Sequence, residues 1–199
     1  MKVQQFVMAY EVEQDRLRAI LPEGFISLRP VLRINAEIRQ SEEETVYVEF
    51  NTAVEAGGKR GWLNIANWNS KDVDLTYTRI GKTVEFTISF LKISYKGVGI
   101  EGGCPAEKDN DWFFTPSKEK IASPIEKINS NREFCDCEFS WKFTSEDAYG
   151  VSTGKTIPAF LTEPKKEYER QELTTRNAAK IPCKQVLGSY VVEFERTCE

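Results

Sequence analysis

A change of hydrophobic period near the N-terminus constrains the fold of this 199-residue chain more than any other feature. An apolar run that includes Met8 and Tyr10 suggests a first strand. Four apolar residues then recur at spacings that suit one buried face of a short helix: Val12, Leu17, Ile20 and Leu21. Pro22 cannot continue this helix, and Gly24 supplies the permissive backbone that a stop requires. The segment therefore predicts a strand followed by a short helix and a tight stop.

From residue 28 the period of the pattern becomes two. One parity holds Leu28, Pro30, Leu32, Ile34, Ala36 and Ile38, and the other holds Arg29, Val31, Arg33, Asn35, Glu37 and Arg39. A half-buried strand gives this alternation, because successive side chains point to opposite faces of a sheet. Residues 6–39 therefore predict a strand–helix–strand unit.

Most of the remaining chain also has the signals of strands. Strands are predicted over residues 46–54, 61–69, 75–80, 83–95, 134–144 and 186–197, with turns at 56–59, 69–72 and 81–82. In the strand over 83–95 the apolar parity switches after Phe90, which predicts a β-bulge or a sharp coil near Phe90 and Leu91. The pattern indicates one mostly β or α+β domain over residues 1–199, an antiparallel β-barrel with a few short helices.

Two further helices and two loops complete the prediction. The helices are expected over residues 117–129, where Pro124 interrupts the pattern, and over 162–177, where Thr162 is the N-cap and Pro164 lies in the first turn. The loops are expected over 97–111 and 150–154. The first loop is rich in glycine but has neither phosphate-loop nor dinucleotide spacing, so we interpret it as a connection or a pocket rim.

Composition excludes several classes of partner. The net charge of −4 argues against nucleic acid, and no apolar run approaches the length of a membrane-spanning helix. The N-terminus lacks the pattern of a signal peptide, so we expect a cytoplasmic protein. The five cysteines are scattered and odd in number, which is typical of reduced thiols. Cys135 and Cys137 share the apolar parity of their strand, and we interpret both as core residues.

The chain contains no histidine. A Ser-His-Asp or Cys-His catalytic system is therefore excluded, and so is a zinc site that uses imidazole. We expect no metal and no cofactor. A general base would have to be Asp, Glu, Lys, Tyr or Cys.

The sequence FVMAYEVEQDRLRAILPEGFISLRPVLRINAEIR, residues 6–39, resembles the opening of the acetoacetate decarboxylase-like family. The resemblance continues more weakly through residues 47–68 and 77–97. It implies a β-barrel that encloses a pocket for a small molecule and that commonly forms homo-oligomers. In decarboxylating members two adjacent lysines in a Tyr-Pro-Lys-Lys context carry the reaction, and one of them forms an imine with a β-keto acid. This chain lacks that motif, and we interpret its one adjacent pair, Lys165 and Lys166, as a solvated helix face.

Two sets of residues are candidates for a site. Lys92 and Lys96 share one strand parity, and one cation could lower the pKa of the other if that face points into the barrel. The second set combines the polar faces of two early strands: Arg33, Asn35 and Glu37 with Glu49 and Asn51. If these faces meet in a pocket, Arg33 could hold a substrate carboxylate and a glutamate could act as base. For both sets the alternative is an outer, solvated face.

The sequence therefore leads to three functional hypotheses. The first is a divergent acetoacetate decarboxylase-like barrel that binds and transforms a small carbonyl or carboxylate compound by metal-free, lyase-type chemistry. The second is a non-enzymatic, lipocalin-like barrel that binds a small ligand among its aromatic residues. The third is a structural or interaction domain whose barrel is filled by side chains.

Overall fold

The computed structural model describes residues 1–102, 112–117, 120–121, 126–144, 149–153 and 166–198. Its elements in chain order are β1 (Lys2–Glu11), α1 (Gln14–Ile20), β2 (Ile26–Gln40), β3 (Glu44–Ala56), β4 (Lys59–Asn69), β5 (Thr76–Ile80), β6 (Thr83–Ile88), β7 (Leu91–Lys96), β8 (Ile100–Glu101), β9 (Trp112–Phe114), β10 (Lys120–Ile121), β11 (Glu126–Cys135), β12 (Glu138–Phe143), β13 (Tyr149–Thr153), α2 (Thr175–Ala179) and β14 (Gln185–Cys198). No helix in this part of the chain is long and apolar enough to cross a membrane.

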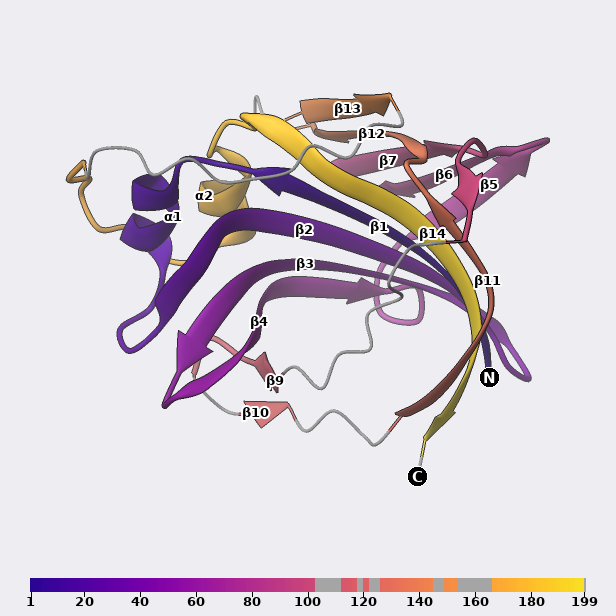
Figure 1. Ribbon diagram of the computed structural model, residues 1–199, viewed down its shortest axis with the longest axis horizontal. Coiled ribbons are helices and arrows are strands. Elements are labelled where there is room, and N and C mark those ends of the chain that lie inside the picture. The colour runs from indigo at the N-terminus through magenta and orange to yellow at the C-terminus, as the bar shows by residue number, and fades with distance from the viewer. Residues whose placement is uncertain (103–111, 118–119, 122–125, 145–148, 154–165, 199) are drawn as a thin grey trace.

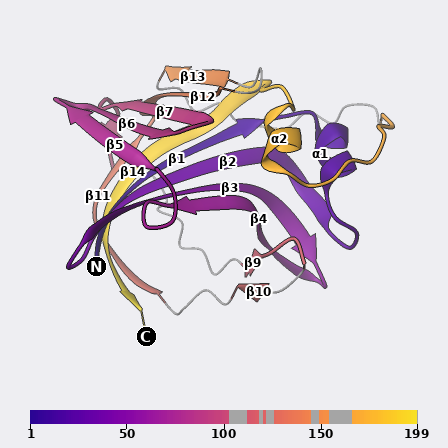
Figure 2. The ribbon, with the colours of Figure 1, turned by 180° about the vertical axis from the view of Figure 1, so that it is seen from behind.

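The strands form two sheets that lie one above the other (Figure 1). The large sheet has the order β10-β9-β4-β3-β2-β1-β14-β11-β8, and the small sheet has the order β13-β12-β7-β6-β5. The large sheet is strongly curved, and its concave face turns away from the small sheet in both views (Figures 1 and 2). Each sheet therefore has one face that packs against the other sheet and one face that does not (Figure 1).

The main hydrophobic core fills the space between the two sheets. The even-numbered residues of β1, β2 and β3 supply one side of it, including Phe6, Ile34 and Phe50. The rings of Phe86 and Tyr95 from the small sheet each lie 5.1 Å from the Phe6 ring, centroid to centroid. The apolar parity predicted for β2 is therefore the face that packs against the small sheet.

The predicted strand–helix–strand unit is confirmed. Leu17 and Ile20 bury one face of α1, and the helix ends before Pro22, as the stop signal indicated. The turns at residues 56–59 and 81–82 are two-residue hairpin connections, because Ala56 pairs with Lys59 and Ile80 pairs with Thr83. The mostly β composition with short helices is also confirmed. Within the described ranges neither sheet closes on itself, and closure into a barrel stays a prediction.

The predicted bulge near Phe90 is wrong. Ile88 pairs with Leu91, so residues 89–90 form a two-residue turn and the expected long strand is the hairpin β6–β7. Paired residues such as Ile88 and Leu91 have their side chains on the same side of a sheet, although here one number is even and the other is odd. The apolar parity therefore switches at this turn. The strand predicted over 134–144 is also divided, at Asp136, whose φ is 51°. Cys137 is fully buried, whereas Cys135 is only partly buried and donates to the Gly102 carbonyl.

The helix predicted over 117–129 is wrong over its described residues, and the helix predicted over 162–177 is confirmed only at residues 175–177. Residues 120–121 lie in β10, which pairs with β9, and residues 126–129 lie in β11, whose pairing with β14 overrides a weak local preference. Residues 166–174 are not helical, and the helix there is only α2, capped by the Thr174 hydroxyl. Thr162 and Pro164 lie outside the described residues. The predicted loop over 150–154 is largely β13, which pairs with β12, and the predicted loop over 97–111 contains the short strand β8.

A wide bulge at the start of β2 was not predicted. Ser27 pairs with Val54 and Leu32 pairs with Thr52, so the four residues 28–31 oppose the single residue Ala53. Three extra residues reverse the alternation of the strand, and for this reason Ile26 is 62% exposed although it shares the parity of buried Ile34. The bulge lies where β2 leaves the turn after α1.

Strand β9, which lies between β10 and β4, pairs with β4 in parallel, in contrast to the predicted antiparallel pattern. Gly61 allows this pairing, because a Cβ at that position would lie 1.7 Å from the Trp112 carbonyl oxygen. The close approach places β9 beside the end of β4 that carries Trp62.

Candidate functional site

The polar parity of β2 and β3 is buried on the concave face of the large sheet. Arg33 is 2% exposed, Glu37 is 1% exposed and Asn51 is fully buried. The alternative of an outer, solvated face is therefore wrong for this set. We call the following side chains the buried polar layer: Gln5, Arg33, Asn35, Glu37, Glu49, Asn51 and Trp62.

Glu49 is the centre of one half of this layer. Its Oε1 accepts hydrogen bonds from Arg33 Nη2 at 3.4 Å, from Asn35 Nδ2 at 3.0 Å and from Asn51 Nδ2 at 2.8 Å. Its Oε2 accepts a hydrogen bond of 3.0 Å from the Tyr47 hydroxyl. Three of these donors share Oε1 and one donates to Oε2, so among the described residues Oε2 keeps one of its two lone-pair sites. This arrangement fixes the position of the Glu49 carboxylate and leaves one acceptor site on Oε2.

Glu37 is the centre of the other half. Arg196 Nη1 and Nη2 donate to its two oxygens at 3.1 Å each, Arg39 Nε donates at 2.6 Å and Gln5 Nε2 donates at 2.9 Å. Burial opposes ionisation of this carboxyl, but the guanidinium groups of Arg196 and Arg39 outweigh it and lower its pKa below the ordinary value of 4.5. No pattern in the sequence indicated Arg196, which comes from β14.

The lowered pKa of Glu37 predicts acid sensitivity. A group whose pKa is depressed in the folded state contributes stability above its unfolded pKa and loses it as the pH falls through the folded pKa. We therefore expect the urea midpoint of the protein to fall below about pH 4.5 and the fall to be smaller in a Glu37→Gln variant, after allowing for its lower starting stability. Urea titrations monitored by tryptophan fluorescence at several pH values would measure how steeply the midpoint falls with pH in the wild type and in the variant. An equal fall in both would contradict the assignment of the acid sensitivity to Glu37.

Stacked cations and aromatic rings extend the layer. The Arg39 guanidinium lies 3.9 Å from the Tyr47 ring centroid, and the Arg33 guanidinium lies 3.7 Å from the Trp62 ring centroid. Such stacking fixes the plane of a guanidinium and its fork of donors. Trp62 and Tyr47 were not among the predicted site residues. The one signal for Trp62 was its place on the same strand parity as Asn64, which is also buried.

The buried polar atoms of the layer that have no hydrogen-bond partner in the described part of the chain include Asn35 Oδ1, Asn51 Oδ1 and Trp62 Nε1. Both asparagines use their Nδ2 groups on Glu49, so the unpaired atoms are the acceptor ends of their amides. Leaving such a group buried and unpaired costs about 1–3 kcal/mol. Atoms of this kind indicate a place where water or a ligand completes the hydrogen bonding.

The predicted lysines lie elsewhere. Lys92 and Lys96 are exposed on the outer face of the small sheet, where each pairs with a glutamate, Lys92 with Glu85 at 3.1 Å and Lys96 with Glu138 at 3.2 Å. An imine-forming lysine requires a desolvated setting or a neighbouring cation to keep its amine neutral. Lys92 and Lys96 both lie in solvent, and Lys142, which is paired opposite Lys92, is exposed as well. Every lysine whose side chain the structure describes is exposed. The described residues also contain no group of three or more acidic or cysteine side chains that could hold a metal ion.

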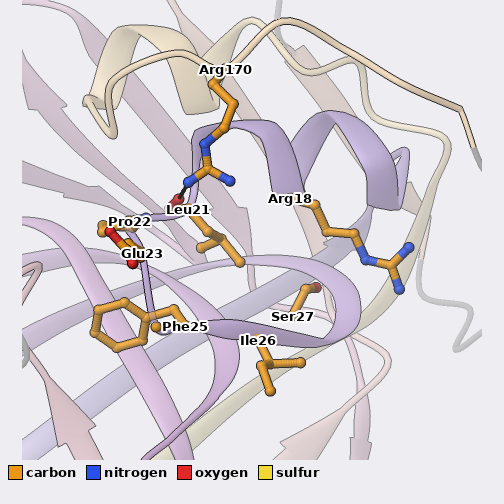
Figure 3. Close-up of a pocket in the computed structure, with 9 residues that line it drawn as sticks. Arg18, Leu21, Pro22, Glu23, Phe25, Ile26, Ser27 and Arg170 are labelled. Carbon is orange, nitrogen blue, oxygen red and sulfur yellow. Dashed lines mark hydrogen bonds between the residues drawn. The ribbon is translucent and has the colours of Figure 1, made fainter.

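An open pocket lies on the outside of the turn between α1 and β2 (Figure 3). Its volume is about 520 Å³, and its lining comes from Arg18, the residues 21–27 and Arg170. Arg170 reaches the turn from the C-terminal segment and donates to the Leu21 carbonyl at 2.7 Å, while Arg18 pairs with Asp15. The lining of this pocket mixes apolar and scattered polar side chains, and it holds no cluster of catalytic groups. The buried polar layer is therefore the better candidate site.

Solved structures with the same arrangement of strands were found, although no protein-family model and no curated protein matches the chain. An acetoacetate decarboxylase from Legionella pneumophila superposes with a TM-score of 0.62 at 12% identity, over 100% of this chain and 83% of that one. An acetoacetate decarboxylase-like enzyme from Sphingomonas wittichii gives 0.51 at 11% identity, over 100% and 92%. The enduracididine biosynthesis enzyme MppR, solved with pyruvate, gives 0.51 at 9% identity, over 99% and 86%. This chain therefore has the acetoacetate decarboxylase-like fold, in a divergent sequence that lacks the paired-lysine motif.

Proposed function

We propose that this protein binds a small carbonyl or carboxylate compound in the buried polar layer and transforms it by lyase-type chemistry that needs no metal. The observation that carries the proposal is the set of unpaired buried atoms, Asn35 Oδ1, Asn51 Oδ1 and Trp62 Nε1, around an ionised network. A compound with hydroxyl or enol donors and carboxylate acceptors would complete these hydrogen bonds. The stacked guanidinium of Arg33 suits a carboxylate, because its planar fork matches the two carboxylate oxygens.

The fold supports this class of ligand. MppR, which shares the fold, has been solved in complex with pyruvate, a small 2-oxo acid. In the present chain the three unpaired atoms are closed to bulk water, so binding includes a local movement of the side chains that cover them. We also propose that the large sheet closes into a barrel around the ligand and that the protein is a cytoplasmic homo-oligomer, which light scattering would test.

Binding would be measured by isothermal titration of pyruvate and acetoacetate. We expect Arg33→Gln to weaken the binding of either acid by about tenfold or more, because it removes a charge-assisted hydrogen bond at a buried site. Arg18→Gln is the matched control, since it removes one arginine from the open pocket beside α1. Loss of binding in Arg18→Gln but not in Arg33→Gln would move the site to that pocket, and no heat with either acid would reject the proposal.

Pure binding without reaction is the second candidate function, and specific observations favour it. The described lysines are all exposed, and each oxygen of Glu37 is filled by two donors, whereas Oε2 of Glu49 has one donor among the described residues. A base role for Glu49 would have to use the remaining site on Oε2. Incubation with acetoacetate and borohydride, followed by peptide mass analysis and a carbon dioxide assay, separates the two functions. A trapped lysine or released carbon dioxide supports the enzyme, and binding without either supports the second candidate.

A further inference from the structure

We infer that Arg29 forms a second anion subsite beside the buried polar layer, and that the ligand is therefore a compound with two carboxylates. This inference rests on the proposed function and names the substrate class for the same site. Arg29 lies in the wide bulge of β2, at the solvent end of the layer, and its side chain is exposed. Its guanidinium has no carboxylate partner in the part of the chain that the structure describes.

The bulge holds Arg29 on a fixed backbone. The Ser27 hydroxyl donates to the Arg29 carbonyl at 3.3 Å, the Val12 amide donates to the Pro30 carbonyl at 2.9 Å and the Thr52 hydroxyl donates to the Val31 carbonyl at 2.8 Å. Three consecutive carbonyls of the bulge are therefore bonded to three different parts of the chain. Bulges of this kind re-aim side chains next to functional sites, and here the extra residues bring Arg29 onto the concave face.

Trp62 connects the two arginines. The Arg33 guanidinium carbon lies 3.7 Å and the Arg29 guanidinium carbon 5.3 Å from the centroid of the same indole ring. The two guanidinium carbons are therefore at most 9.0 Å apart, the sum of these distances. The Nε1 of this ring is a buried donor without a partner among the described residues, which is a second sign that an acceptor belongs at this position.

The spacing fits a short diacid. The terminal carbons of a five-carbon diacid are roughly 5 Å apart when extended, from C–C bonds of about 1.5 Å. A guanidinium beyond each end would require the two guanidinium carbons to lie about 13 Å apart, so within 9.0 Å such a molecule can bridge Arg33 and Arg29 only by lying alongside both guanidiniums. Arg33 would hold the inner carboxylate. Arg29 would hold the outer carboxylate at the solvent side, where the two charged groups lose less of their hydration.

A purely structural role for Arg29 predicts a different result. An exposed cation over a tryptophan stabilises a fold slightly, whatever ligand is present. A structural arginine would therefore change stability a little and would not distinguish between ligands. The experiment must compare two ligands that differ only at the second carboxylate.

The test uses the full chain and two 2-oxo acids of equal length, 2-oxoglutarate and 2-oxopentanoate, in isothermal titrations. We expect the wild type to bind the diacid about tenfold more tightly, as for one added charge-assisted contact. Arg29→Gln should remove this preference and leave the affinity for 2-oxopentanoate unchanged, whereas Arg33→Gln should weaken both. Arg60→Gln is the matched control, because Arg60 is an exposed arginine of β4 that pairs with Glu55 at 3.3 Å.

The possible failures can be told apart. Equal affinity for the two acids in the wild type, or a preference that survives in Arg29→Gln, overturns the second subsite but leaves the proposed function standing. A preference that Arg60→Gln removes equally well also overturns it, because the effect would then be one of net charge. If neither acid binds to the wild type, the proposed function fails and the inference fails with it.

Discussion

Replacing Glu37 with glutamine should lower the free energy of unfolding by about 3–5 kcal/mol, because it leaves two partly buried guanidiniums without their buried anion. Glu37 is 1% exposed and is the common acceptor of Arg39, Arg196 and Gln5. Arg196 belongs to β14 and Arg39 to β2, so this carboxylate also connects the second strand to the last one. Urea unfolding at pH 7, followed by tryptophan fluorescence, would measure the loss.

The control for this prediction is Glu55→Gln. Glu55 makes one ion pair of 3.3 Å with Arg60, whose side chain is 74% exposed. We expect this variant to lose at most about 1 kcal/mol, because exposed pairs gain little in water. If the two variants lose the same small amount, the buried network around Glu37 contributes no more than a surface contact.

Replacing Phe6 with alanine should cost about 3–5 kcal/mol, the range for removing a fully buried aromatic ring. Phe6 is 1% exposed and contacts Phe86 and Tyr95 across the space between the sheets, so the cavity would open where the two layers meet. Differential scanning calorimetry and urea unfolding would both report the loss. The proposed ligand should still bind, since Phe6 faces away from the buried polar layer.

Phe90→Ala is the matched control for Phe6. Its ring is only partly buried, in the turn between β6 and β7, and lies 5.1 Å from the Trp68 ring. The expected loss is smaller, about 0.5–1.5 kcal/mol from the aromatic contact together with some apolar area. An equal loss in the two variants would show that the sheet-to-sheet contact is not the main source of stability around Phe6.

The fold was readable from the sequence where local period and tertiary burial agree. The run from Leu32 to Ile38 alternates cleanly because one of its faces packs against the small sheet, and Pro22 ends α1 for steric reasons that need no tertiary contact. Of the helix predicted over 162–177, residues 166–174 are not helical, because long-range contacts hold that segment. Tyr168, for example, donates to Glu13 at 2.6 Å. No local pattern encodes a contact of this kind.

The candidate site was only half readable. The polar parity of β2 and β3 indicated Arg33, Asn35, Glu37 and Glu49, because two paired strands with polar residues in register bring them together. The pattern could not tell that this face is buried, since a polar parity is normally the solvated one. It also could not reveal Arg196 or Trp62, which reach the layer through the pairing of β14 with β1 and the pairing of β4 with β3. Those pairings depend on the whole topology.

The wide bulge at the start of β2 also limits how this chain could vary in length. Its three extra residues reverse the strand, so Ser27 and Leu32 face the same side although one is odd and the other even. Deleting or inserting a single residue here would move side chains to the opposite face of the sheet. The side chains affected would be either those before the bulge or those from Arg33 to Glu37 after it. Two residues could be lost or gained without that reversal. Length changes at this point are therefore compatible with the fold only in steps of two residues.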